Sequence, residues 1–136
     1  MPYFAWEDLT DLIPAEYATQ ALDDDDDHEP EKWESVQAAS DRAVDLLIRP
    51  QYTGPIADPP AILRDAAVLE CAFACYARRN EAAAFPHMDR LKAIRETLKR
   101  IGAGTEALFP TAATRTSAVA ITEEARTYSP AGRLAG

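Results

Sequence analysis

The feature that most constrains this chain is the segment from Ala61 to Ala77, in which fourteen of seventeen residues are apolar. Two prolines precede the segment, so we predict a helix that begins there and ends near Arg79–Asn80. A helix that is apolar almost all round has to be buried on most of its sides. In a chain of 136 residues little protein is left to cover it. The pattern therefore suggests that a neighbouring subunit helps to bury this helix.

Shorter apolar periodicities predict further helices around this segment. Pro14 ends a first short helix and opens a second as its first residue. A third helix begins at Pro30 or Glu31 and stops before Pro50, because a residue that precedes proline resists helical geometry. The last helix begins near residues 85–86, and Gly102 is placed just beyond its end. The apolar stripe of the third helix comprises Trp33, Val36, Ala39 or Ser40, Ala43 and Leu47, widened by Val44 and Ile48.

The chain changes character after this last helix. Residues 103–136 are rich in Thr, Ala and Gly, and the spacing of Val119 and Ile121 is that of a short strand or hairpin. We therefore predict a mainly α small helical bundle over residues 1–102 and an extended C-terminal arm over residues 103–136. The residues of the arm that we expect to contact a partner are Val119, Ile121, Arg126, Tyr128, Arg133 and Leu134.

Charge is distributed unevenly along the chain. Residues 1–48 hold fourteen of the 23 acidic residues and two basic ones, a balance of −12, whereas residues 49–136 have a balance of +3. An overall charge of −9 argues against DNA or anionic lipid as a bound ligand. Two halves of opposite charge favour head-to-tail attraction between copies, although solubility alone also explains the asymmetry. The longest apolar run is too short for a membrane span, and the acidic N-terminus is unlike a signal peptide.

The most acidic segment is a run of five aspartates followed by His28 and Glu29. Hard cations prefer several carboxylates, so calcium binding is one interpretation. The run lacks the spacing that turns such side chains inward, and a solvated loop is therefore favoured. We expect this loop to form an acidic patch, at the surface or beside a channel, made of Asp23, Asp24, Asp25, Asp26 and Asp27.

No motif predicts catalysis, and we expect no catalytic residues, cofactor or metal. Cys71 and Cys75 share one face of the apolar helix; they suit a redox pair less well than two buried, small apolar side chains. His28 and His87 do not lie in a serine or cysteine triad pattern. The five glycines are scattered and form no phosphate loop. Trp6 and Trp33 are predicted to be core or interface residues.

The order of short motifs resembles a known phage family. The chain opens with Tyr-x-x-x-x-Asp-Leu (Tyr3 to Leu9), and residues 38–47 resemble a helix of the type Ala-x-x-x-Ala-x-x-x-Ile-Asp-x-x-Leu. Arg-Pro-Gln-Tyr (49–52), Pro-Pro-Ala-Ile-Leu (59–63), Cys-Tyr-Ala-Arg-Arg (75–79) and Arg-Thr-Tyr-Ser (126–129) follow in the family's order. These patterns are similar to those of the phage Gp36-like family, which is related to the head–tail connector, or adaptor, proteins of tailed phages.

The resemblance implies a structural protein of the virion neck, assembled in the cytoplasm of the bacterial host. Copies would form a homo-oligomeric ring, typically a dodecamer, under the portal protein and line part of the DNA channel. A tail-side neck protein would be a further partner, and the genomic DNA would pass through without specific binding. The alternatives are a tail-completion protein on the tail side of the same joint, or a monomeric helical protein-binding module.

Overall fold

The computed structural model describes residues 2–49, 51–53 and 55–109, and within these residues the chain is helical and has no strand. Contact density divides the chain into two compact units, Met1–Glu106 and Ala107–Gly136. Every helix of the described residues lies in the first unit, which confirms the predicted mainly α fold. The predicted boundary after residue 102 stays a prediction, and the possible strand at Val119–Ile121 lies outside the described residues. No described helix is both long and apolar enough to cross a membrane.

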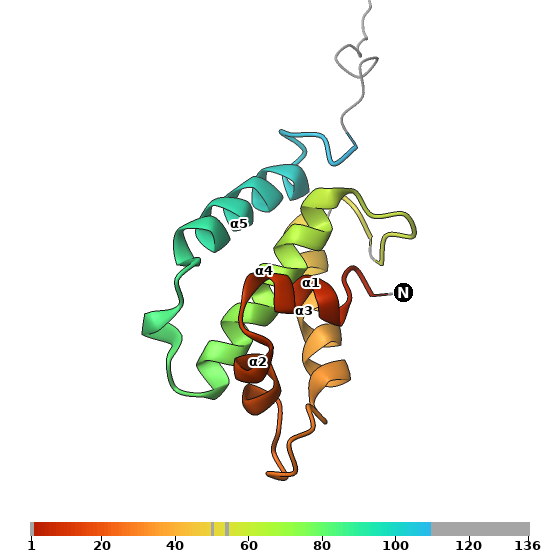
Figure 1. Ribbon diagram of the computed structural model, residues 1–136. Coiled ribbons are helices and arrows are strands. Elements are labelled where there is room, and N and C mark those ends of the chain that lie inside the picture. Colours follow the sequence, from red (N-terminus) through yellow and green to blue (C-terminus); the bar gives the residue numbers. More distant parts are fainter. Residues whose placement is uncertain (1, 50, 54, 110–136) are drawn as a thin grey trace, which may run out of the picture. The chain divides into compact units, whose positions relative to one another are not determined.

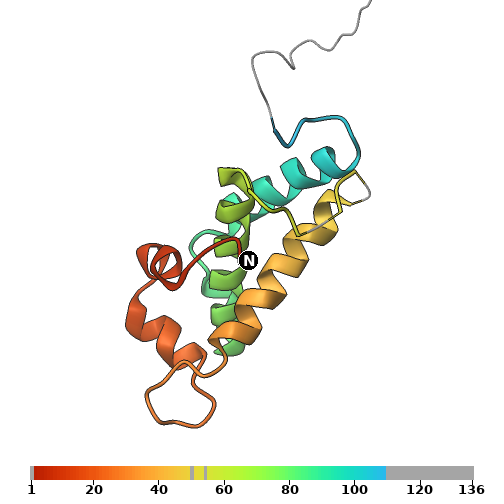
Figure 2. The same ribbon diagram turned by 90° about the vertical axis from the view of Figure 1, so that its right-hand side faces the viewer.

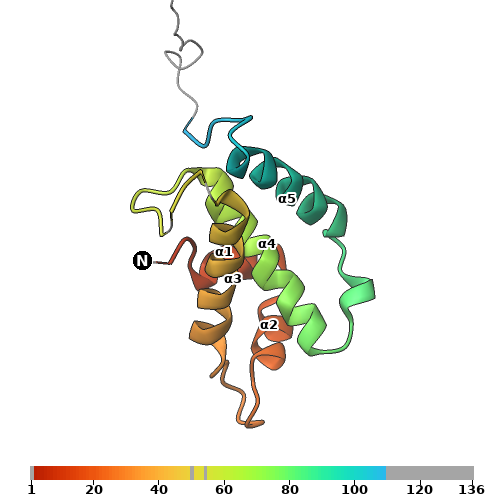
Figure 3. The same cartoon turned by 180° about the vertical axis from the view of Figure 1, so that it is seen from behind.

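The predicted apolar helix is α4 (Ala61–Arg78), and it forms the centre of the first unit. Helices α1 (Trp6–Leu12), α2 (Ala15–Ala21), α3 (Trp33–Ile48) and α5 (Met88–Gly102) all pack against it (Figures 1 and 3). Its buried side chains include Leu63, Leu69 and Cys71, which are almost completely inaccessible. The chain's own helices therefore cover most of α4, so the apolar character of α4 does not itself require a neighbouring subunit.

The N-terminal helices follow the sequence pattern closely. Pro14 separates α1 from α2, but it is the residue just before α2 rather than its first residue. Leu9, Ala18 and Leu22 are fully buried. Trp6 and Trp33, predicted to be core or interface residues, are half-buried and pack edge to face with ring centroids 5.1 Å apart. Phe4 lies 5.6 Å from Trp33 in the same way. This cluster connects the start of the chain to the start of α3.

Helix α3 begins later than predicted, at Trp33, and ends at Ile48, before the proline as expected. The backbone N–H of Lys32 donates to the carbonyl of Leu22 at 3.0 Å, so residues 30–32 form a turn tied to the end of α2. The buried face of α3 is formed by Ser40, Val44 and Ile48. It lies one residue further along the sequence than Ala39, Ala43 and Leu47, the predicted centre of the apolar stripe. Trp33, Val36, Ala43 and Leu47 are half-buried, and Ala39 is exposed.

Helix α5 ends differently from the prediction. Gly102 is its last helical residue and is buried. A Cβ atom at Gly102 would lie 2.4 Å from the carbonyl oxygen of Leu47 and 2.7 Å from that of Arg49, so the glycine permits close contact with the end of α3. The left-handed residue that terminates the helix is Gly104, with φ of +83°. Helix α5 begins at Met88, slightly later than predicted, and a short 3-10 helix, Ala82–Ala84, precedes it.

Candidate functional site

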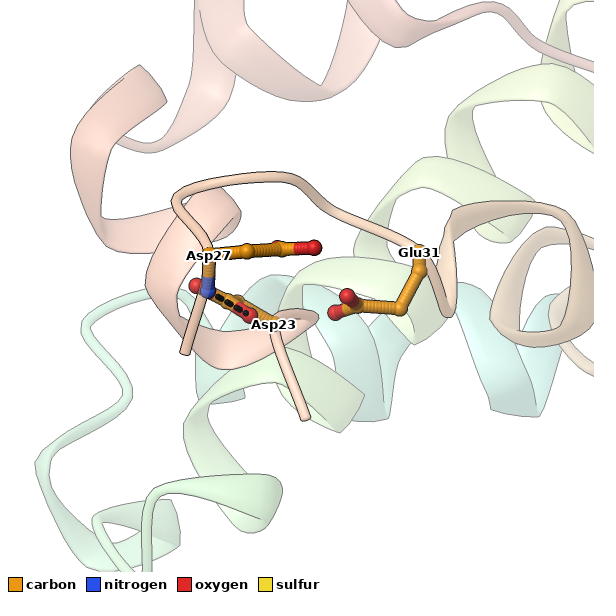
Figure 4. A group of neighbouring side chains, drawn as sticks. All are labelled: Asp23, Asp27 and Glu31. Atoms are coloured by element: carbon orange, nitrogen blue, oxygen red, sulfur yellow. Dashed lines mark hydrogen bonds between the residues drawn. The ribbon is translucent and has the colours of Figure 1, made fainter. Parts of the chain in front are cut away.

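The acidic loop, residues 23–31, is the first candidate site. Three of its carboxylates, those of Asp23, Asp27 and Glu31, converge with ligand atoms within 4.8 Å of one another (Figure 4). The two oxygens of Asp23 accept the backbone N–H groups of Asp27 at 3.2 Å and His28 at 2.8 Å. The expectation that nothing turns the acids of the run inward is therefore wrong for Asp23 and Asp27, and Glu31 joins them from outside the run. The remaining acids of the run, Asp24, Asp25 and Asp26, are exposed as predicted.

The electrostatics of the cluster follow from these contacts. Partial desolvation opposes ionisation of Asp23, but donation from His28, Asp27 and Asp26 outweighs it and holds the pKa of Asp23 below its ordinary value. Desolvation, together with the negative charges of Asp27 and Asp23, raises the pKa of Glu31. Three carboxylates are a donor set of the kind that a hard cation such as Ca²⁺ prefers, although Ca²⁺ takes six to eight oxygens. In the present geometry the carboxylate of Asp23 serves to fix the loop by accepting backbone N–H groups.

Two cations tie the acidic loop to the helices. Asp24 forms an ion pair with Arg78 of α4, and Lys32 lies 3.9 Å from the same carboxylate. The side chain of Arg78 also donates to the carbonyl of Ala21 at 2.8 Å. The base of the loop is therefore anchored on α2 and α4, while Asp25 and Glu29 remain exposed.

A second group of polar residues, which we call the Tyr3 joint, comprises Tyr3, Asp41, Asp45 and Ile56. The Tyr3 hydroxyl donates to Asp45 and accepts the backbone N–H of Ile56 at 2.9 Å. The Tyr3 backbone N–H donates to Asp41 at 3.2 Å. Burial, followed by the bond to Asp45, raises the pKa of Tyr3 to about 12. The joint fixes the N-terminal segment and the 51–60 loop to α3, and sequence reasoning did not predict it.

Asp41 is the least satisfied member of the Tyr3 joint. Its Oδ1 atom is buried and accepts no hydrogen bond within the described part of the chain. Burial accordingly raises the pKa of Asp41, although the Tyr3 N–H acts in the opposite direction.

An apolar groove of about 430 Å³ lies between α3 and α4. Small and aromatic side chains form its walls: Val36, Ala39, Ala43, Phe73, Ala74 and Ala77. Arg95 of α5 lies beside it and donates two hydrogen bonds, of 2.7 and 2.8 Å, to Glu70 of α4. The groove has the size of a small ligand or side-chain pocket.

The two cysteines are buried, as the sequence predicts. Cys71 and Cys75 are free and buried, and the hydrogen bond to Cys75 together with burial raises the pKa of the Cys71 thiol. A raised pKa makes that thiol a poor nucleophile. His87 immediately precedes α5, and its ring lies edge-on to Phe85.

The basic face of α5 is partly neutralised within the chain. Arg95 pairs with Glu70, Lys99 with Glu96 and Arg100 with Glu106, at distances of 2.7, 3.2 and 3.0 Å. Arg90 and Lys92 are exposed and form no ion pair with a described residue. The face is therefore a weak candidate for binding phosphates.

The predicted partner residues of the arm, Val119, Ile121, Arg126, Tyr128, Arg133 and Leu134, lie outside the described residues. Their role stays a prediction.

A family model described as "Bacteriophage Mu, Gp36" matches residues 3–125, which is most of the chain. The chain belongs to this phage family. No curated protein and no solved structure matches it. Several residues of the family-like motifs make contacts that hold the fold together. Asp8 accepts the N–H of Ala5 at 2.9 Å, Leu9 is buried, and Tyr3 and Asp45 meet in the Tyr3 joint.

Proposed function

We propose that this Gp36-family chain is a structural protein of the phage neck, a head–tail connector that forms a homo-oligomeric ring under the portal. Membership of a phage family over residues 3–125 is the observation that carries the proposal. The neck position and the ring are our inference from the relation between Gp36-like and connector proteins noted in the sequence. The ring is typically a dodecamer, and its partners are the portal protein and a tail-side neck protein.

The distribution of charge supports this role. The acidic loop carries several exposed carboxylates on a chain whose net charge is −9. A negative surface beside a DNA channel repels phosphates, whereas a basic surface would bind DNA strongly through counterion release. The genome would therefore pass without specific binding. We place the chain in the virion after assembly in the host cytoplasm, and we assign it no catalytic activity or cofactor.

Two further functions compete with the connector. A tail-completion protein would form its ring on the tail side of the same joint. A monomeric protein-binding module is favoured by the α3–α4 groove, whose walls are mostly apolar. The groove would then bind an apolar segment of another protein.

Electron microscopy of the full chain with its cognate portal protein tests these functions. A connector gives a ring coaxial with the portal and in direct contact with it. A tail-completion protein gives no direct contact with the portal but binds the tail-side assembly. A protein that stays monomeric in both mixtures, as judged by multi-angle light scattering, contradicts the neck assignment.

A further inference from the structure

The C-terminal half of α3 has an exposed surface that the fold itself does not cover. Between α3 and the loop that follows it lies a hollow of about 380 Å³, which we call the α3 hollow. Its lining includes Arg42 and Leu46 of α3, Arg49 just beyond the end of α3, and Pro55 of the loop. The side chain of Leu46 is 61% exposed, which is unusual for a large apolar residue in this unit. A partner that covers the Leu46 side chain removes apolar surface from water, and this burial stabilises the complex.

The α3 hollow is also positively charged at its margins. Arg42 and Arg49 are exposed, and neither forms an ion pair with any described carboxylate. Asp45 also lines the hollow, but its carboxylate accepts the hydroxyl of Tyr3. Both arginines line this hollow, Arg42 from within α3 and Arg49 from the residue that follows it, and the helical rise over seven residues separates their backbones by about 10 Å. The hollow therefore offers two unpaired guanidinium groups on either side of an apolar side chain.

Matching charges lie at the other end of the same helix. The acidic loop precedes the N-terminus of α3, at one end of this helix (Figure 2). The residues that line the α3 hollow belong to the C-terminal half of α3 and to the loop that follows it. Asp25 and Glu29 at the loop's surface are exposed and form no ion pair within the described chain. The ion pair between Arg78 and Asp24 anchors the base of the loop on α4, and this contact holds the exposed acids Asp25 and Glu29 in place.

We propose that the acidic loop of one copy docks in the α3 hollow of a second copy, with Asp25 and Glu29 facing Arg42 and Arg49. The inference rests on the proposed function and names the surfaces through which copies of the chain meet. Because the two surfaces differ and lie at opposite ends of α3, the contact is head to tail. Contacts of this kind close into a ring when the rotation between successive copies permits it. Exposed ion pairs are screened by salt, so association weakens as ionic strength rises.

Charge reversal on the full-length chain tests the contact. The hollow variant is Arg42→Glu with Arg49→Glu, and the loop variant is Asp25→Lys with Glu29→Lys. In either variant alone the loop and the hollow carry charges of the same sign and repel each other. We therefore expect the dissociation constant of self-association, measured by sedimentation velocity, to rise at least tenfold. An equimolar mixture of the two variants restores association. In the mixture, every loop finds a hollow of opposite charge on the other variant.

A matched control for the hollow variant is Arg90→Glu with Lys92→Glu, which makes the same change of net charge on exposed residues of α5. This control should associate like the unaltered chain. The inference is overturned if the hollow and loop variants associate as the unaltered chain does, if their mixture fails to recover, or if the unaltered chain does not self-associate at low salt. These outcomes leave the connector assignment to the portal experiment. If the loop variant still forms a ring on the portal, the proposed contact is wrong while the proposed connector function stands.

Discussion

The two ends of α3 use carboxylates in different ways. At the N-terminal end, the exposed acidic loop is fixed by acids that accept N–H groups four or five residues away, as Asp23 does from Asp27 and His28. In the C-terminal half, Asp41 and Asp45 accept hydrogen bonds from Tyr3, which is 38 and 42 residues away in the chain. Aspartate thus fixes a local turn in the exposed loop and joins distant segments of the chain at the partly buried Tyr3 joint.

The largest loss of stability at the C-terminal end of α3 is expected from a substitution at Gly102. In Gly102→Ala the new Cβ meets two backbone carbonyl oxygens at 2.4 and 2.7 Å, and these atoms move only if the helices separate. We expect a loss of about 1–3 kcal/mol in the free energy of unfolding, measured by chemical denaturation. Gly104→Ala is the matched control, because its cost is the left-handed φ and is about 1 kcal/mol. A smaller loss at Gly102 than at Gly104 contradicts the close contact.

The Tyr3 joint gives the next largest effect. Tyr3→Phe keeps the ring but removes the hydroxyl, which leaves the N–H of Ile56 without this acceptor and Asp45 without this donor. Because the two bonds are part-buried, we expect a loss of about 1 kcal/mol in unfolding free energy by urea denaturation at pH 7. An unchanged midpoint contradicts a structural role for the joint.

The same variant has a pH signature. The pKa of Tyr3 is raised to about 12 in the folded protein from an ordinary value of 10.0, so folding favours the neutral phenol. Its contribution is complete below about pH 10 and is lost as the pH rises from 10 toward 12. The difference in stability between the unaltered chain and Tyr3→Phe should therefore shrink over this range. Tyr17, whose pKa is also raised to about 12, is present in both proteins and cancels in the difference.

The smallest effect is expected in the acidic loop. Asp23→Ala removes the acceptor for the N–H groups of Asp27 and His28, so amide hydrogen exchange at these two residues should accelerate. The global thermal midpoint should stay unchanged, because the bonds are exposed. Asp25→Ala is the control, since its exposed side chain accepts no hydrogen bond among the described residues. Equal exchange rates in both variants contradict the role of Asp23.

Much of the fold could be predicted because the signals are local. Pro14 and the residue before Pro50 mark helix ends through steric exclusion, and the apolar run of α4 marks its burial. The errors arose where distant segments interact. Helix α3 begins later than its sequence pattern predicts because the backbone N–H of Lys32 bonds to Leu22. Gly102 is helical rather than a terminator because it contacts Leu47, a residue far from it in the sequence.

The candidate sites were predictable to a smaller extent. The acidity of the loop was plain from five consecutive aspartates, but the convergence of Asp23, Asp27 and Glu31 depends on the turn between them. The spacing of Arg42, Leu46 and Arg49 places them on one side of a helix and was a usable signal that the sequence analysis missed.

The sequence by itself determined that the chain is helical, that α4 is central, and that it belongs with the phage Gp36 proteins, since periodicity, prolines and motif order are properties of neighbouring residues. The tertiary structure alone decided that the chain's own helices cover most of α4, that Tyr3 meets Asp45, and that the acidic loop and the α3 hollow lie at opposite ends of one helix. Burial and contacts between distant residues set these features, because both depend on how the helices pack together.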